Sequence, residues 1–158
     1  MALQYDSNNP DIYFQLGQIN QSIKNYNEAI SQYKKAIERD TNPAFYYYLA
    51  ECYAEINNIF EEKKALIECV KYDNQNYNAH YKLAKICKSQ NDIQGAISGM
   101  RKALELNNNF IDAKYGLAIL LELKGQKDEA INLYEEILAI NPEHKEAIDN
   151  LKMLKPQS

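Results

Sequence analysis

Few side chains in this sequence have the types and spacing needed for catalysis or metal binding. The 158 residues include two histidines, His80 and His144, and three cysteines, Cys52, Cys69 and Cys87. A zinc site normally uses paired cysteines or histidines a few positions apart, and no such pair occurs among these residues. The pattern therefore predicts buried structural thiols, no catalytic residue, no metal and no cofactor. It gives no support for an enzyme.

The composition is that of an ordinary soluble protein. Charged residues make up 25% of the chain and the net charge is -4, so binding to nucleic acid through its phosphates is not expected. The N-terminus lacks the pattern of a signal peptide, and no apolar run reaches the roughly 20 residues that a membrane span needs. An odd number of cysteines favours reducing surroundings. We therefore expect a cytoplasmic protein without membrane insertion.

The elements that position any functional side chain follow from a repeated leucine. Leucines recur at intervals of 33, 34, 34 and 34 residues, and a small residue follows each of the first four. These pairs are Leu16 with Gly17, Leu49 with Ala50, Leu83 with Ala84, and Leu117 with Ala118, and the fifth leucine is Leu151. Such a period is typical of a solenoid, in which each unit buries its apolar face against its neighbours. Function is then expected on a surface.

Each period is predicted to hold two amphipathic helices. Apolar residues fall three and four positions apart, which is helical spacing. Pro10 and Pro43 are placed to begin first helices, while Asn25 and Asp92 are placed to cap second helices. The small residues after the leucines are expected to face small residues of the second helices, namely Ala29, Ala96 and Ala130. Large side chains at these crossings would force the helices apart.

The residues at these positions resemble the tetratricopeptide repeat (TPR), a helix-turn-helix unit of 34 residues. The first period supplies Tyr13, Leu16, Gly17, Ala29, Tyr33 and Ala36, and the fourth supplies Leu117, Ala118, Gly125, Ala130, Tyr134 and Pro142. The resemblance implies an all-α fold, a right-handed α-solenoid of helix-turn-helix TPR units with a C-terminal capping helix. The implied repeats are residues 10–42, 43–76, 77–110 and 111–144, followed by a capping helix at 145–155 and a tail at 156–158.

Two parts of the chain depart from this regular pattern. Residues 1–9 match the close of a second helix and the turn after it, so we expect them to be the remnant of a preceding repeat in a larger protein. In the second repeat, Glu62 and Lys63 stand where other repeats have alanine and isoleucine. A looser or rotated second helix is expected there.

The resemblance also implies a place for a partner. In similar proteins the first helices line a concave groove that holds a peptide or a partner helix. Carried over to this chain, the positions two residues before each full-repeat leucine are aromatic: Phe14, Tyr47, Tyr81 and Tyr115. The remaining candidate partner-binding residues are Gln18, Tyr48, Glu51, Lys82, Lys85, Lys88 and Ile119. The rings suit two roles, anchoring a peptide or packing between adjacent first helices, and both stay open.

Charge divides the candidate groove. Glu51 belongs to the second repeat, whereas Lys82, Lys85 and Lys88 follow one side of the third at spacings of three. The lysine strip fits either an acidic ligand or a helix face that is simply solvated.

The function implied by the resemblance is a protein-protein interaction scaffold that binds a peptide or helical segment of a partner in the groove. Two alternatives are a self-assembly module that forms homo-oligomers through its repeat ends, and the substrate-recruiting segment of a multidomain enzyme. The partner is not specified by the sequence, because surface positions of such repeats vary while the scaffold stays the same.

Overall fold

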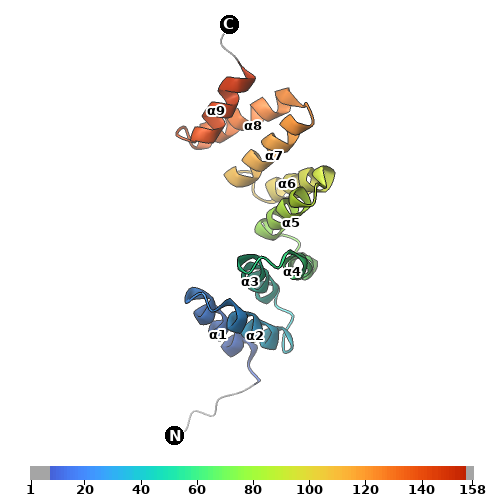
Figure 1. Ribbon diagram of the computed structural model, residues 1–158, viewed down its shortest axis with the longest axis vertical. Coiled ribbons are helices and arrows are strands. Elements are labelled where there is room, and N and C mark those ends of the chain that lie inside the picture. The colour runs from blue at the N-terminus through green and yellow to red at the C-terminus, as the bar shows by residue number, and fades with distance from the viewer. Residues whose placement is uncertain (1–7, 156–158) are drawn as a thin grey trace. The chain divides into compact units, whose positions relative to one another are not determined.

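A computed structural model describes residues 8–155, and within that range the chain folds into α-helices joined by short turns, with no strand (Figure 1). Each predicted repeat interval contains two of these helices, and a single helix follows the fourth. In chain order they are α1 (Pro10–Ser22), α2 (Tyr26–Ile37), α3 (Pro43–Glu55), α4 (Ile59–Tyr72), α5 (Tyr77–Ser89), α6 (Ile93–Leu106), α7 (Ile111–Leu123), α8 (Lys127–Ile140) and α9 (Lys145–Leu154).

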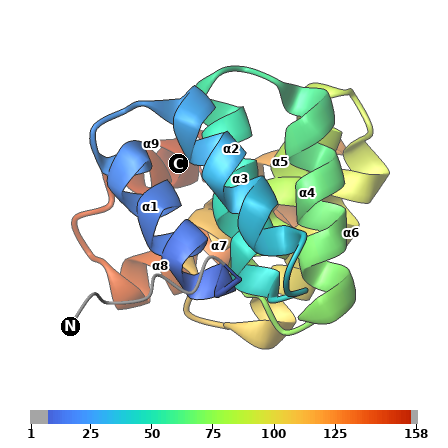
Figure 2. The same cartoon turned by 90° about the horizontal axis from the view of Figure 1, so that it is seen from below.

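The chain divides into two compact units, Met1–Gln75 and Asn76–Ser158, which are described separately. In the first unit α1 packs against α2, α2 against α3, and α3 against α4, and the hairpin of α1 and α2 is seen in Figure 2. In the second unit the same succession runs from α5 to α9. This order confirms the all-α fold of TPR helix-turn-helix units. The expected remnant of an earlier repeat falls largely on residues 1–7, and the tail is residues 156–158, both outside the described residues.

The helix starts follow from local chemistry. Pro10 and Pro43 occupy the first helical positions of α1 and α3, where a missing N–H is harmless. The Asp92 carboxylate accepts a hydrogen bond from the Gly95 N–H at 2.8 Å and so caps α6, as the sequence predicts. The expected side-chain cap at Asn25 is wrong. The Asn25 amide instead donates toward the Asn20 side chain at 3.4 Å, so its oxygen does not serve the first turn of α2.

One residue in each hairpin turn adopts the left-handed conformation. These residues are Lys24, Asn57, Asn91 and Gly125, with φ of 59°, 57°, 62° and 76°, and they share one position of the repeat. Glycine and asparagine take this conformation readily, whereas a lysine pays a steric cost there. The turn therefore reverses the chain in the same way in every repeat, although Gly125 is the only glycine among the four left-handed residues.

Small residues sit where the two helices of each hairpin cross. Gly17 is buried, and a Cβ added to it would lie 2.4 Å from the Tyr33 ring. Ala84 is buried against Gly99 of α6, where an added Cβ would lie 2.8 Å from the Ala84 Cβ. Close crossings are thus present in both units, but the residues found against Gly17 and Ala84 are Tyr33 and Gly99 and not the predicted alanines of the second helices.

The second repeat does not show the expected loosening. Glu62 and Lys63 are half-buried at the repeat positions where Ala29 and Ile30 are buried. Ala65, Leu66 and Cys69 are nevertheless buried in the contact of α4 with α3. The helix keeps its register because these three residues supply its apolar face.

We predict that Ala84→Leu destabilises the protein by about 1 to 3 kcal/mol, because no space exists at this crossing for a larger side chain. Thermal or urea unfolding followed by circular dichroism measures the effect. Ser98→Leu, on the exposed side of α6, is the matched control and should change stability little. Equal stability of Ala84→Leu and wild type would contradict the assigned crossing.

Candidate functional site

A pocket of about 410 Å³ opens in the second unit between α5 and α7, with α6 contributing to its floor. Its volume falls within the range of about 300–1,000 Å³ that is common for ligand sites. The residues that line it are Tyr81, Lys85, Lys88, Ser89, Met100, Asp112, Tyr115, Gly116 and Ile119. Apolar groups therefore form much of its wall, and charged groups stand at its edges.

The pocket depends on a glycine, Gly116, which lines it next to Met100. Met100 is buried, and a Cβ added to Gly116 would lie 2.9 Å from its terminal methyl group and 3.3 Å from its sulfur. The same repeat position carries Gln15, Tyr48 and Lys82 in the other repeats. The absence of a side chain at Gly116 thus leaves space next to Met100, whose buried thioether lines the pocket.

Two aromatic side chains line the pocket, and each packs on the N-cap residue of a later helix, Phe110 for α7 and His144 for α9. The Tyr81 ring lies 4.9 Å from the Phe110 ring, measured between centroids. The Tyr115 ring lies 5.4 Å from the His144 ring and 5.9 Å from the Tyr134 ring. Tyr81 and Tyr115 remain half-exposed. They therefore have the packing role that the sequence predicted, and they also line the pocket.

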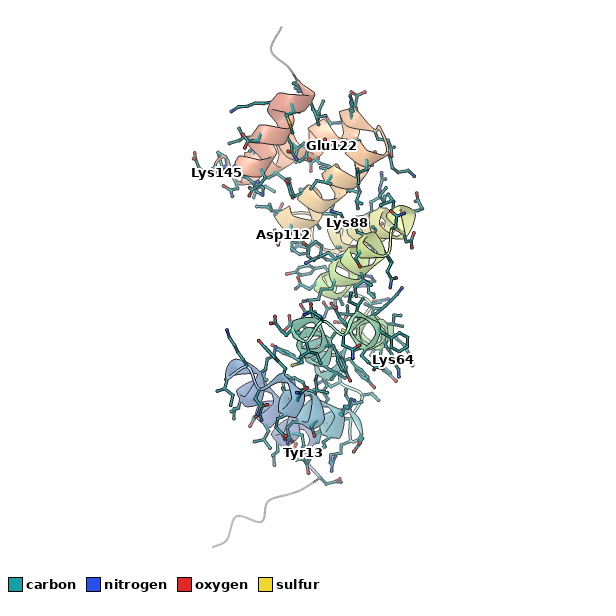
Figure 3. The ribbon with its side chains drawn as sticks, viewed as in Figure 1. Tyr13, Lys64, Lys88, Asp112, Glu122 and Lys145 are labelled. Carbon is teal, nitrogen blue, oxygen red and sulfur yellow. The ribbon has the colours of Figure 1, made fainter. Side chains whose placement is uncertain are left out.

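Charged groups of both signs line the pocket, and Figure 3 labels one of each, Lys88 near the end of α5 and Asp112 at the start of α7. The ammonium of Lys85 lies 5.6 Å from the centroid of the Tyr81 ring, within range of a cation-π contact. Burial, and then the negative charge of Asp112, raise the pKa of the Tyr81 hydroxyl. Tyr81 therefore keeps its proton at neutral pH and can donate a hydrogen bond.

Phe14 and Tyr48, two of the predicted partner-binding residues, belong to an aromatic cluster in the first unit. The Phe14 ring lies 4.9 Å from Phe45, 5.3 Å from Tyr48 and 5.8 Å from Tyr33. Phe45 and Tyr33 are buried, so the cluster joins α1 and α2 to α3 as part of the core. Gln18, one turn beyond Phe14, is half-buried. The contacts of the Phe14 and Tyr48 rings are packing contacts within the first unit.

Tyr47 and Glu51 interact one turn apart on α3. Burial, followed by the charge and hydrogen bonding of Glu51, raises the pKa of Tyr47. The Tyr47 ring also meets Tyr48 edge-on at 6.0 Å. Lys82 lies half-buried on α5, outside the residues that line the pocket.

The pocket brings together five of the eleven predicted partner-binding residues, namely Tyr81, Lys85, Lys88, Tyr115 and Ile119. Sequence reasoning missed Ser89, Met100, Asp112 and Gly116. The signal for Gly116 was present, because a glycine stands in a column of larger residues. No sequence feature marked Met100 as a pocket residue, because its repeat position predicts an ordinary core residue of a second helix.

The histidines and cysteines have structural surroundings. Burial raises the pKa of the Cys52 thiol to about 12 and that of Cys69 to about 11. His144 caps α9, where its Nδ1 accepts a hydrogen bond from the Ala147 N–H at 3.2 Å. Among residues 8–155, no group of three or more His, Cys, Asp or Glu side chains is arranged to hold a metal ion.

None of the helices in the described part of the chain is both long and apolar enough to cross a membrane.

Comparison with known proteins identifies the family. Models of the tetratricopeptide repeat match residues 10–43 and 89–152. The uncharacterized protein ycf37 of Cyanophora paradoxa is 33% identical over 133 residues, which are 84% of this chain and 67% of that protein. The chain belongs to the tetratricopeptide repeat family.

Other TPR proteins agree with this assignment. The TPR repeat-containing protein MJ1428 of Methanocaldococcus jannaschii is 32% identical over 118 residues, which cover 73% of this chain but only 20% of that protein. A crystal structure of MamA protein superposes with a TM-score of 0.84 at 26% identity, covering 92% of this chain and 80% of the MamA chain. This TPR chain therefore spans about a fifth of one curated relative and two thirds of the other.

We predict that the buried thiols make stability depend on alkaline pH. Folding favours the protonated thiols of Cys52 and Cys69, so their contribution is complete below pH 9.0 and is lost as pH rises toward about 12 and 11. Urea unfolding from pH 7 to 11 should show a shallower alkaline loss of stability for Cys52→Ala/Cys69→Ala than for wild type. The difference at pH 7 isolates the packing effect of the substitutions, and parallel pH curves would contradict the prediction.

Proposed function

We propose that this TPR chain is a protein-protein interaction scaffold, and that the pocket between α5 and α7 binds a peptide or helical segment of a partner. The observation that carries the proposal is the meeting of five predicted groove positions around one pocket. An apolar floor with a few polar groups at the edge is the usual composition of a ligand site. Tyr81 and Tyr115 would offer rigid contact area together with hydroxyl groups.

The chemistry of the lining favours binding over catalysis. Neither histidine nor cysteine is among the residues around the pocket. The Ser89 hydroxyl donates a hydrogen bond to the Ile86 carbonyl at 2.7 Å, which is a helix-end contact and leaves the serine without an activating base there. We therefore propose a non-enzymatic scaffold, and we place it in the cytoplasm because an odd number of cysteines favours reducing surroundings. A role as the recruiting segment of a larger protein fits the small share of MJ1428 that it spans.

The proposal predicts that a side chain at Gly116 blocks binding. A phage-displayed library of random 12-residue peptides should be selected on the wild-type chain, and the enriched peptides synthesised for fluorescence anisotropy. Gly116→Leu should lose most of their affinity, because the leucine would occupy the space over Met100.

Two controls make this test specific. The Gly116→Leu chain should keep its helical spectrum, since leucine favours a helix more than glycine does and the atom it meets is a flexible methionine end. Tyr81→Ala offers a second route to the same result without added bulk. Enriched peptides that bind wild type and both variants equally would place the site elsewhere.

A second candidate, self-assembly, is supported by the exposed face of α1. Ile19 is 58% exposed, whereas Cys52, Ile86 and Leu120 at the same repeat position are 0%, 5% and 0% exposed. Leu16 is likewise 39% exposed, compared with 6% for Leu49. The equivalent positions compared in later repeats are buried, and contacts between copies would bury these positions on α1.

Self-assembly predicts a molar mass that rises with concentration in static light scattering, and a monomer after Ile19→Lys. The substitution lies on the exposed face, so it should leave the fold intact. A constant monomer mass for wild type across the concentration series would remove this candidate.

A further inference from the structure

We infer that the pocket between α5 and α7 is polarised, and that it selects a segment in which a large apolar side chain has an acidic residue on one side only. This inference rests on the proposed peptide-binding function and specifies the ligand's chemistry. It follows from the order in which charged and apolar groups succeed one another along the two helices.

The positive end lies along the last two turns of α5. Lys85 and Lys88 both line the pocket and both are exposed, so their ammonium groups are available to a ligand carboxylate. The C-terminal end of a helix carries only about half a negative charge, which two full positive charges outweigh. The Lys85 contact with the Tyr81 ring is weak enough to be exchanged for a carboxylate.

The negative end lies at the first turn of α7. Asp112 lines the pocket there and acts on Tyr81, whose pKa it helps to raise. A ligand carboxylate at this end would face Asp112, whereas a peptide N–H or a basic side chain would be accepted. The two edges therefore discriminate between opposite ligand charges.

Between these ends lies the apolar centre formed by Met100, Gly116 and Ile119. The pocket's volume of about 410 Å³ accommodates a side chain of the size of leucine, methionine or phenylalanine together with its backbone. Tyr81 and Lys88 are seven residues apart on α5, or about 10 Å along the helix axis. An extended ligand covers that length with about three residues. The selected unit is thus an acidic residue, a large apolar residue, and a neutral or basic residue, in succession.

The test uses the same random peptide library on wild type, Lys85→Glu/Lys88→Glu and Asp112→Lys. Wild type should enrich peptides with Asp or Glu on one side of a large apolar residue. The double variant should bind those peptides about tenfold or more weakly and should enrich Lys or Arg at the acidic position. Asp112→Lys should keep the first acidic residue and accept a second one on the opposite side of the apolar residue.

A matched control separates local charge from net charge. Lys127→Glu/Lys152→Glu changes the net charge by the same amount at exposed positions outside this pocket, and it should bind the wild-type peptides normally. Circular dichroism melts verify that all variants fold. The inference would be overturned if the peptides enriched on wild type showed no charge preference. It would also be overturned if Lys85→Glu/Lys88→Glu enriched peptides with the same charges as wild type. In both cases the proposed peptide binding would stand. Failure of wild type to enrich any peptide blocked by Gly116→Leu would instead reject the proposed function and this inference with it.

Discussion

The close crossing of two helices at a small residue is the constraint on which each repeat depends. Gly17 and Ala84 have no room for a larger side chain, because the Tyr33 ring and Gly99 lie directly against them. When the helices meet at that point, large apolar residues beside it can interlock at the density of a protein interior. The left-handed residue that reverses each hairpin brings the helices to this crossing at the same register in every repeat.

The pocket arises where the repeat departs from its own pattern. Gly116 replaces the larger residues found at its position in other repeats, and this leaves space above the buried Met100 side chain between α5 and α7. Tyr81 and Tyr115 belong both to the packing of the unit and to the pocket, since each ring packs on the N-cap residue of a later helix and also lines the pocket. A substitution at either ring would therefore change both the packing and the pocket lining, whereas Lys85, Lys88 and Asp112 contribute charge to the lining.

The aromatic positions illustrate how far a repeat pattern predicts a site. Phe14 and Tyr81 occupy equivalent positions, yet Phe14 lies in a cluster with Phe45 and Tyr48, while Tyr81 lines an open pocket. The difference comes from their neighbours in the next first helix. Phe45 and Tyr48 fill the space beside Phe14, but the residues equivalent to them near Tyr81 are Ala113 and Gly116. Only the volumes of side chains in contact decide which ring is covered.

The sequence by itself determined the helix pairs, the small residues at their crossings and the membership of the TPR family, because local periodicity and a constant repeat encode them. It also placed Tyr81, Lys85, Lys88, Tyr115 and Ile119 among the binding candidates. Only the tertiary structure decided that Met100 of a second helix and Asp112 line the same pocket as the lysines. These relations depend on how side chains from three helices meet in space, which the spacing of residues along one chain does not specify.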